Sequence, residues 1–343
     1  MTTLVTGATG FVGSHVARQL VSAGYPVRVL VRKNSNLRAL EGLALEHVEG
    51  DLRDAGSLES AMKGVRRVYH VAADYRLWTR DPQEIYRTNV DGTRMLLEAA
   101  SRAGVERVVY TSTVATIAVP HAGNSLPDET THASLHQMIG HYKRSKFLAE
   151  LEAIKAAGAG VPVVIVNPTA PVGTADWKPT PTGRIIVDFL NGKMPAYVDT
   201  GLNVAPVEDV AKGHLLAAEK GRIGERYILG GRNMTLKEIL DALAPIAGRP
   251  APRFRLPHAV ALAAGYADEL YSRIAGREPQ IPVEGVKMSR HRMFVATGKA
   301  EREFGYEPGS IESAFERSVG WYREHGYIQS RAARKNVAHA VAA

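Results

Sequence analysis

Two residues of one short segment could carry acid–base chemistry. Tyr142 and Lys146 stand four positions apart in His-Tyr-Lys-Arg-Ser-Lys, a spacing that puts both side chains on one face of a helix. A nearby ammonium would favour the phenolate of Tyr142, because a free tyrosine has a pKa of about 10. Alone, the pair is more typical of a solvated helix surface, so its interpretation depends on the rest of the chain.

The segment Thr6-Gly-Ala-Thr-Gly-Phe-Val-Gly13 offers a site for a dinucleotide. Its glycines follow a Leu-Val-Thr run and precede a helical pattern, the context in which a glycine turn brings backbone N–H groups to a pyrophosphate. The spacing is Gly-x-x-Gly-x-x-Gly, and a purely structural strand–turn–helix is the alternative. Together with Tyr142 and Lys146, the motif favours a dinucleotide-dependent enzyme.

The elements that would position these residues alternate between strand and helix. Short β-rich runs occupy residues 3–6, 27–31, 44–48, 67–72, 107–112 and 163–167. Helical patterns lie between them, at residues 12–23, 57–64, 81–104 and 135–157. This alternation predicts an α/β fold with a doubly wound parallel (Rossmann) sheet, whose ligand lies at the carboxyl ends of the strands.

The second half of the chain does not continue the regular alternation of strand and helix patterns. Prolines and glycines between Pro168 and Gly183 predict an irregular loop over the active site. Residues 208–220 and 226–229 would return to the sheet, whereas 235–248 and 257–327 are mostly helical in pattern. We expect a dinucleotide-binding domain of residues 1–168 plus about 202–229, a smaller, mostly helical, discontinuous substrate domain of about 169–201 plus 230–328, and a tail of 329–343.

Composition narrows the class of protein. The 343 residues are 45% hydrophobic and 23% charged, as in soluble globular proteins. With no cysteine, a disulfide framework, a thiolate metal site and a cysteine nucleophile are excluded, and the His and Asp/Glu spacing suggests no metal site. The net charge of +8 favours an anionic partner, but the basic residues are scattered and no nucleic-acid module is present, so we expect no nucleic acid.

Two segments of the sequence indicate where in the cell we expect the protein. Met1 leads within a few residues into a core strand rather than a signal peptide, which predicts a cytoplasmic protein. The apolar stretch from His258 to Ile274 is interrupted by Asp268, Glu269 and Arg273, so it is too short and polar to span a bilayer. We expect it to pack its apolar face in the second domain. Peripheral contact with the inner face of the membrane is the alternative.

The end of the second strand bears on the choice of cofactor. It reads Val29-Leu30-Val31-Arg32-Lys33, without the acid that NAD-binding proteins offer to the adenosine ribose. Arg32 could bind a 2′-phosphate, which favours NADP over NAD, although a solvated strand-end residue is the alternative. Asp51 and Leu52, past the third strand, are placed to meet the adenine, with a plain turn residue as the alternative for Asp51.

Seven segments in this order resemble the extended short-chain dehydrogenase/reductase family from Thr6 to about Tyr327. Within that family the likeness is to dihydroflavonol reductase-like proteins and to hopanoid-associated sugar epimerases. The segments are Thr6–Gly13, Gly50-Asp51-Leu52, His70-Val-Ala-Ala73, Asn89-Val-Asp-Gly-Thr93, Tyr110-Thr-Ser-Thr113, Tyr142–Lys146 and Asn167-Pro-Thr-Ala-Pro-Val-Gly173.

The resemblance implies a role for each residue. Tyr142 would be the general acid or base, Lys146 would bind the nicotinamide ribose and lower the tyrosine pKa, and Thr113 would hold the substrate oxygen. The implied cofactor contacts are Gly7, Thr9, Gly10, Phe11, Val12, Gly13, Arg32, Asp51, Leu52, Ala72, Ala73, Asn89, Thr111, Tyr142, Lys146, Pro168, Ala170 and Val172. In this set Ala72 and Ala73 would leave room beneath the cofactor, and Asn89 would brace the sheet.

The implied reaction moves a hydride between the nicotinamide and a substrate carbon while Tyr142 passes a proton. Val114 and Ala115 follow Thr113, where sugar-nucleotide dehydratases of the family typically have an Asp-Glu pair, so dehydration is disfavoured. We expect NADPH-linked reduction of a carbonyl, or the reverse oxidation, on a small sugar-like or lipid-linked molecule, in hopanoid side-chain biosynthesis. NAD(P)-assisted sugar epimerisation and a non-catalytic dinucleotide sensor are the alternatives.

Substrate contacts and assembly are less constrained by the sequence. Tyr75 and Trp78 follow the fourth strand, where aromatic rings could stack on a substrate. A packed loop is the alternative. Thr113 would complete the substrate contacts. Relatives often dimerise through helices flanking the sheet, so we expect a homodimer or a monomer.

Overall fold

The computed structural model describes residues 2–119 and 125–328. Within them, seven parallel strands form the main sheet in the order β10-β6-β5-β4-β1-β2-β3. These strands are β1 (Thr2–Thr6), β2 (Val27–Val31), β3 (Glu46–Glu49), β4 (Val65–His70), β5 (Arg107–Thr111), β6 (Val163–Pro168) and β10 (Arg226–Leu229). The chain leaves β1 toward β2 on one side and places β4 on the other, so the predicted doubly wound sheet is confirmed.

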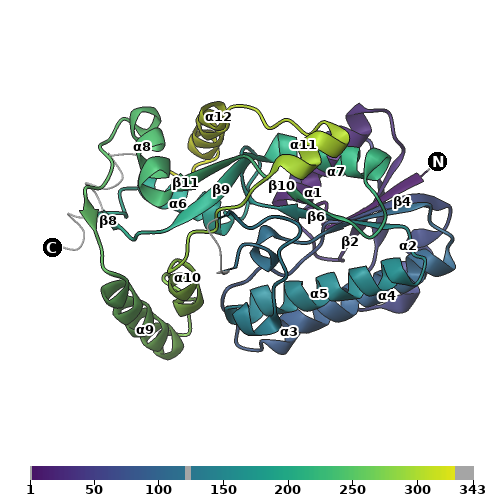
Figure 1. Ribbon diagram of the computed structural model, residues 1–343, viewed down its shortest axis with the longest axis horizontal. Coiled ribbons are helices and arrows are strands. Elements are labelled where there is room, and N and C mark those ends of the chain that lie inside the picture. The colour runs from purple at the N-terminus through teal and green to yellow at the C-terminus, as the bar shows by residue number, and fades with distance from the viewer. Residues whose placement is uncertain (1, 120–124, 329–343) are drawn as a thin grey trace.

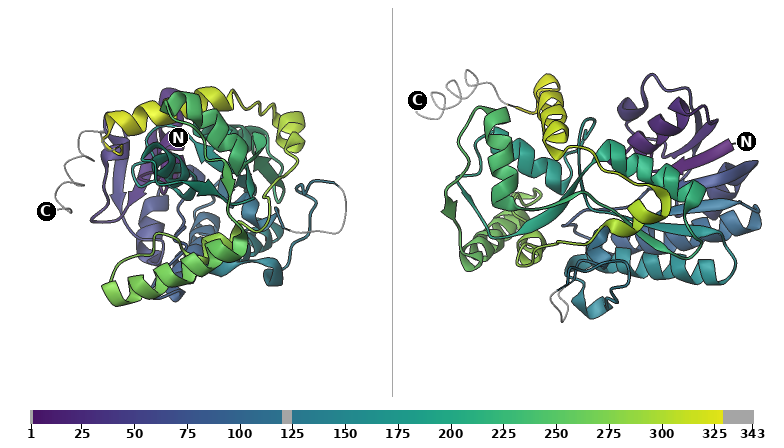
Figure 2. Two further views of the ribbon diagram at one scale, coloured as in Figure 1. Left: turned by 90° about the vertical axis from the view of Figure 1, so that its left-hand side faces the viewer. Right: turned by 45° about the horizontal axis from the view of Figure 1, so that its top comes forward.

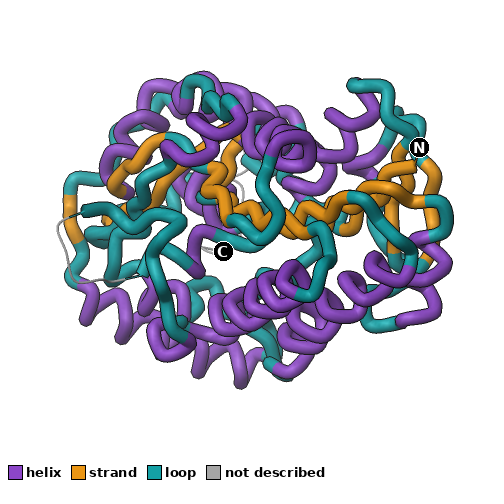
Figure 3. The backbone as a smooth tube through the Cα atoms, turned by 45° about the vertical axis from the view of Figure 1, so that its right-hand side comes forward, coloured by secondary structure: helices purple, strands orange, loops and turns teal. Residues whose placement is uncertain are grey.

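Helices cover both faces of this sheet (Figure 1). One layer contains α2 (Ala55–Met62), α4 (Gly92–Arg102) and α5 (Gly140–Gly158), and the opposite layer contains α1 (Phe11–Ser22), α7 (Val207–Lys220) and α11 (Gly298–Phe304). Figure 3 shows the strands running between the helices. Because both faces are covered, β6 is a continuous apolar run, in which Val163 to Val166 are fully buried.

The C-terminal part has a core of its own and is mostly helical, as predicted. Strands β7 (Ala170–Val172), β9 (Gly201–Pro206) and β11 (Arg232–Thr235) form a small sheet in the order β11-β9-β7. Helices α6 (Pro181–Leu190), α8 (Leu236–Ala247) and α12 (Ile311–Glu324) pack around it, with Leu240 and Phe315 fully buried. A short pair of strands, β8 (Ala196–Tyr197) and β12 (Phe254–Arg255), lies beside them.

Two differences from the sequence prediction concern helices. The expected helix 81–104 is divided into α3 (Gln83–Tyr86), a π-helical stretch (Arg87–Asp91) and α4, and π-helical turns are common at functional sites. The stretch expected to be irregular contains β7 and α6. Helix α6 can form there because Pro181 occupies its first turn, where the missing N–H is no loss.

The helix predicted at the apolar stretch forms, but the prediction for its apolar face is wrong. Helix α9 (His258–Ala275) and α10 (Val283–Met288) form a pair at the outside of the molecule (Figures 1 and 2). Leu270 is 63% exposed and Ile274 is 79% exposed on α9. The periodicity predicts one apolar face but not the direction in which tertiary contacts turn it. Among the described residues, no helix is long and apolar enough to cross a membrane.

The chain passes between its two parts several times. Strand β9 pairs with β7 and β11, whereas α7, which follows it directly, packs on the main sheet. Helix α11 lies against α7 and β10. The division near residues 202 and 230 stays a prediction.

Candidate active site

The glycine segment forms a tight turn between β1 and α1. The backbone N–H of Gly10 donates to the carbonyl oxygen of Gly7 at 2.9 Å, and Gly7 has a φ of +71°, which favours glycine. A methyl group at Gly7 would lie 2.5 Å from the backbone nitrogen of Ala72, and one at Gly13 would strike the carbonyl of Gly7. Only glycines allow this packing, and the turn leaves the N-terminus of α1 open at the exposed Gly10. The turn therefore fits a pyrophosphate.

The charged residues that follow β2 and β3 differ in whether they have an ion-pair partner. The Asp51 carboxylate accepts two hydrogen bonds from the Arg53 guanidinium, at 2.9 and 2.8 Å, and these bonds lower the pKa of Asp51. Arg32 is exposed just after β2; its backbone N–H donates to Ser35 Oγ at 3.0 Å, and its guanidinium forms none of the ion pairs found in residues 2–119 and 125–328. Just past β2, Arg32 thus presents an exposed cation, while the Asp51 carboxylate is engaged by Arg53.

Tyr142 and Thr113 lie together at the carboxyl end of β5. Tyr142 is in the first turn of α5, and Thr113 follows β5. Burial raises the pKa of Tyr142, and a hydrogen bond with the Thr113 side chain opposes this effect. Thr113 is itself held in place, because its Oγ1 accepts from the Ala115 N–H at 3.2 Å and its carbonyl accepts from Asn167 Nδ2 at 3.1 Å. The two hydroxyls can therefore act on one substrate oxygen.

Lys146 is buried on the same helix. Its Nζ donates to the hydroxyl of Tyr110 at 3.0 Å and to the carbonyl of Thr111 at 2.7 Å. Burial lowers the pKa of Lys146 to about 7, against the opposing charge of Glu150, and such shifts cluster at functional sites. The ammonium is thus directed at the end of β5, and its effect on the pKa of Tyr142 stays a prediction.

A buried network behind Lys146 was missed from the sequence. Glu150 lies one helical turn after Lys146, and its Oε2 accepts from Asn167 Nδ2 at 2.8 Å and from Thr116 Oγ1 at 2.9 Å. Its Oε1 lies 3.3 Å from the guanidinium of Arg226. The signal was available, because Glu150 stands four residues after Lys146 and so shares its helix face.

Asn89 joins the loop after β4 to α5. It is buried in the π-helical stretch, where its Oδ1 accepts from the Asp74 N–H at 2.7 Å and its Nδ2 donates to the Asp74 carbonyl and to Ser145 Oγ, at 2.8 and 2.9 Å. Ser145 stands beside Lys146, so Asn89 fixes the loop that carries Ala72 and Ala73 relative to the lysine.

The structure places the other expected cofactor residues around the same strand ends. Thr9, Phe11 and Val12 lie in the glycine turn and the first turn of α1, and Leu52 is buried beside Gly92. Thr111 is buried at the end of β5, with its Oγ1 3.0 Å from Nε2 of His214. Pro168 ends β6, and Ala170 and Val172 are the buried residues of β7.

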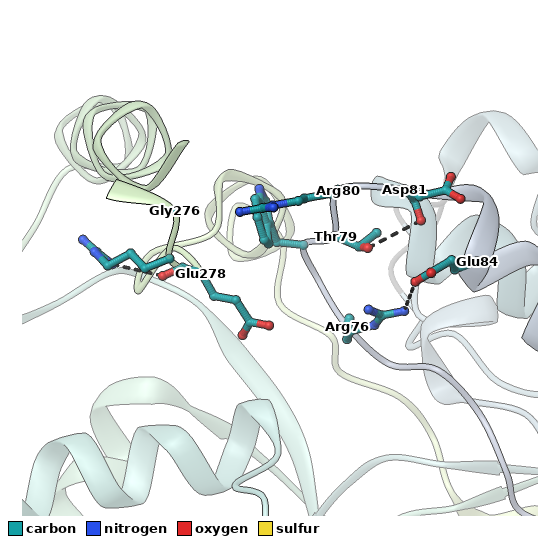
Figure 4. Close-up of a pocket in the computed structure, with 9 residues that line it drawn as sticks. Arg76, Thr79, Arg80, Asp81, Glu84, Gly276 and Glu278 are labelled. Atoms are coloured by element: carbon teal, nitrogen blue, oxygen red, sulfur yellow. Dashed lines mark hydrogen bonds and ion pairs between the residues drawn. The ribbon is translucent and has the colours of Figure 1, made fainter. Parts of the chain in front are cut away.

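The two expected aromatic substrate contacts have separate environments. Burial raises the pKa of Tyr75 to about 12, and Asp176 and Tyr142 are among the groups that add to this shift, so Tyr75 belongs to the surroundings of Tyr142. Trp78 instead lines an open pocket of about 330 Å³ whose lining residues do not include Tyr142. Figure 4 shows Arg76, Arg80 and Glu84 on one side of it and Gly276 and Glu278, which follow α9, on the other.

A glycine turn at the centre of a parallel sheet, with a tyrosine and a lysine at neighbouring strand ends, is the arrangement of a dinucleotide-dependent oxidoreductase. Residues 3–230 match the family model described as "NAD dependent epimerase/dehydratase family". The chain therefore belongs to this family, the extended short-chain dehydrogenases/reductases, and is an NAD(P)-dependent oxidoreductase or epimerase.

Individual relatives agree with this assignment. The chain is 46% identical to a Synechocystis protein named "Putative dihydroflavonol 4-reductase", over 95% of this chain and 96% of that protein. It is 40% identical to the sterol demethylase protein B of Methylococcus capsulatus, over 96% and 100% of the two chains. The crystal structure of gox2253 superposes with a TM-score of 0.85 at 45% identity, covering 96% of this chain and 99% of that one. Among the described residues, no cluster of His, Asp and Glu could hold a metal ion.

Proposed function

We propose that this enzyme is an NADPH-linked reductase of a carbonyl group, able to run in reverse as an alcohol dehydrogenase. The observation that carries the proposal is the hydroxyl of Tyr142, paired with Thr113 at the end of β5 and followed on its helix by the buried Lys146. The dihydroflavonol 4-reductase named above is a reductase by name, which supports net reduction over epimerisation.

Each residue has a defined part in this reaction. Bound NADPH would supply a hydride to the carbonyl carbon. The hydroxyl of Thr113 would hold the carbonyl oxygen, and the phenol of Tyr142 would donate its proton to that oxygen to give an alcohol. Lys146 would favour the phenolate left behind until a proton returns from solvent.

The preference for NADP rests on the charges at the edge of the sheet. A 2′-phosphate would meet the unpaired Arg32 guanidinium, whereas the carboxylate of Asp51 is already engaged by Arg53. Because Arg32 would gain a charge-assisted hydrogen bond, it supports the phosphorylated cofactor.

For the substrate we propose a sugar-like or lipid-linked molecule, in line with the likeness to hopanoid-associated proteins. One relative is named for a sterol, a polycyclic lipid, which supports a lipid-linked carbonyl in hopanoid side-chain biosynthesis. A substrate of this kind would be reached at a membrane, and we propose a cytoplasmic enzyme that works at the inner membrane face.

The outer face of α9 supports membrane contact. Val260, Leu270, Tyr271 and Ile274 are 52%, 63%, 60% and 79% exposed, and their spacing places them along one side of the helix. The acids of α9 turn the other way. Asp268 accepts from the N–H of Ile281 at 2.8 Å, and Glu269 accepts from the N–H of Val283 at 2.8 Å. The helix is therefore inverted: its two acids bond to the backbone near the start of α10, and these four large apolar side chains face outward.

Charge complementarity makes an anionic bilayer the occupant we propose for this face. The ammonium of Lys287 lies 5.8 Å from the ring centre of Tyr266. The guanidinium of Arg277 lies 5.0 Å from that of Tyr271 and is also paired with Asp268 at 2.6 Å. Arg273 is exposed on the helix itself. Aromatic rings flanked by cations suit a lipid headgroup region, whereas a second copy would bring like charges together.

The first test is a titration of the purified protein with NADP and NAD. We expect NADP to bind more tightly, and Arg32→Ala to weaken NADP by about tenfold to hundredfold with little effect on NAD, because one charge-assisted hydrogen bond is lost. Arg184→Ala, which removes an exposed arginine of α6, is the matched control. Tight NAD binding indifferent to Arg32 would favour the epimerase, and failure to bind either dinucleotide would favour a protein without this reaction.

A further inference from the structure

Lys143 is a buried cation that has no carboxylate partner among the described residues. It follows Tyr142 in the first turn of α5 and is 7% exposed. Its Nζ lies 3.4 Å from Sδ of Met293, and it takes part in none of the ion pairs within the described segments. A thioether is a weak acceptor and an ammonium carries three donors, so Met293 leaves most of its hydrogen-bonding capacity unused.

The surroundings of Lys143 adjoin the catalytic hydroxyls. Helix α5 contacts the 3₁₀ turn Val114–Thr116, which begins directly after Thr113. Met293 packs on the buried cluster that contains Val114, Ile117 and Val295. Through Met293, the ammonium therefore lies at the apolar wall that begins directly after Thr113.

Such a placement is costly for stability. An unpaired charge away from water destabilises a fold by several kcal/mol, and burial lowers the pKa of Lys143 to about 8. The neighbouring charges on α5 are compensated differently: Lys146 has two oxygen partners, and Glu150 has Asn167, Thr116 and Arg226. An uncompensated cation beside a catalytic pair suggests that its partner arrives with the substrate.

We propose that Lys143 is a specificity-determining residue that binds a carboxylate of the substrate, next to the oxygen held by Thr113 and Tyr142. One ammonium balances one negative charge, whereas the diphosphate of a sugar nucleotide carries two and is usually met by several donors. The apolar wall of Val114, Ile117 and Met293 would contact the carbon skeleton. The substrate class is thus an apolar ring or chain with a carbonyl or hydroxyl near a carboxylate.

The test measures binding rather than turnover. Isothermal titration of the full chain, with NADP bound and without it, compares cyclohexanecarboxylate with the uncharged cyclohexanecarboxamide. We expect the wild type to prefer the carboxylate by about tenfold. Lys143→Met should abolish that preference and Lys143→Arg should keep it. Lys155→Met, which removes an exposed lysine of the same helix, controls for net charge.

The melting temperature separates a binding role from a structural one. Lys143→Met removes a buried charge, so we expect the melting temperature to stay the same or to rise while carboxylate selectivity is lost. Equal binding of acid and amide by the wild type, or selectivity that survives in Lys143→Met, would overturn the proposal. This inference rests on the proposed reductase function. If that function is wrong, the protein will not oxidise NADPH, but the comparison of carboxylate and amide binding will still test the role of Lys143.

Discussion

At the residue level, a substitution of Tyr142 tests its role in catalysis separately from cofactor binding. In Tyr142→Phe the ring still fills the same position, but the proton donor beside Thr113 is gone. We expect kcat for carbonyl reduction to fall by about 10²-fold or more, with little change in the dissociation constant for NADPH. Steady-state NADPH oxidation and a separate cofactor titration measure the two quantities.

A second tyrosine provides the control for that substitution. The hydroxyl of Tyr86, on α3, lies 3.1 Å from Nδ1 of His141, so Tyr86→Phe removes the same group from a hydrogen-bonded position near α5. Its kcat should stay within a few-fold of the wild type. Equal losses in the two variants would contradict the role assigned to Tyr142 and would point to a general effect on α5.

At the level of elements, Asp176 links α6 to α12. Its carboxylate accepts from Thr180 N–H and Oγ1, each at 2.9 Å, and from the hydroxyl of Tyr322 at 2.8 Å. Burial raises the pKa of Asp176 from 3.8 to about 6. The folded state therefore binds the proton more tightly than the unfolded state, and this stabilisation is full below about pH 4 and is lost as the pH rises through about 6.

Replacing Asp176 by Asn should remove this pH dependence. We expect the free energy of unfolding of Asp176→Asn relative to the wild type to shift in favour of the variant between about pH 4 and 7, by at most about 3 kcal/mol. Urea unfolding across that range measures the difference, and Asp188→Asn, at a partly exposed carboxylate of α6, is the control. A difference that does not change with pH would show that Asp176 does not titrate in this range.

The elements also show what the sequence could and could not determine. The sheet and the cofactor loop were predictable because local sequence determines them. The signals were continuous apolar runs, such as Val163 to Val166, and the glycine turn. Strand β7 was missed because three residues beside Pro168 give no periodic signal. The partners of Glu150 and of Lys143 come from segments far apart in the chain, so spacing could suggest a shared helix face but not what that face would meet.

For the whole molecule, the inverted helix α9 predicts where the enzyme works. Sedimentation with vesicles of phosphatidylcholine alone, and with an equal mixture of phosphatidylcholine and phosphatidylglycerol, tests this. We expect binding to the anionic mixture only, weakened by salt, because the cations around Tyr266 and Tyr271 would add to the apolar contact.

One substitution on α9 and one elsewhere make the prediction specific. Ile274→Glu replaces a side chain that is 79% exposed and should weaken vesicle binding by about tenfold or more, since it removes buried apolar area and adds a repelled charge. Ile223→Glu, at a 54% exposed isoleucine outside α9, should bind as the wild type does. If the wild type ignores the anionic vesicles and instead forms a dimer that Ile274→Glu dissociates, a second copy of the chain covers α9, and the membrane proposal is wrong. If both variants lose binding equally, the contact is general hydrophobic adhesion, and the exposed row from Val260 to Ile274 has no special part in it.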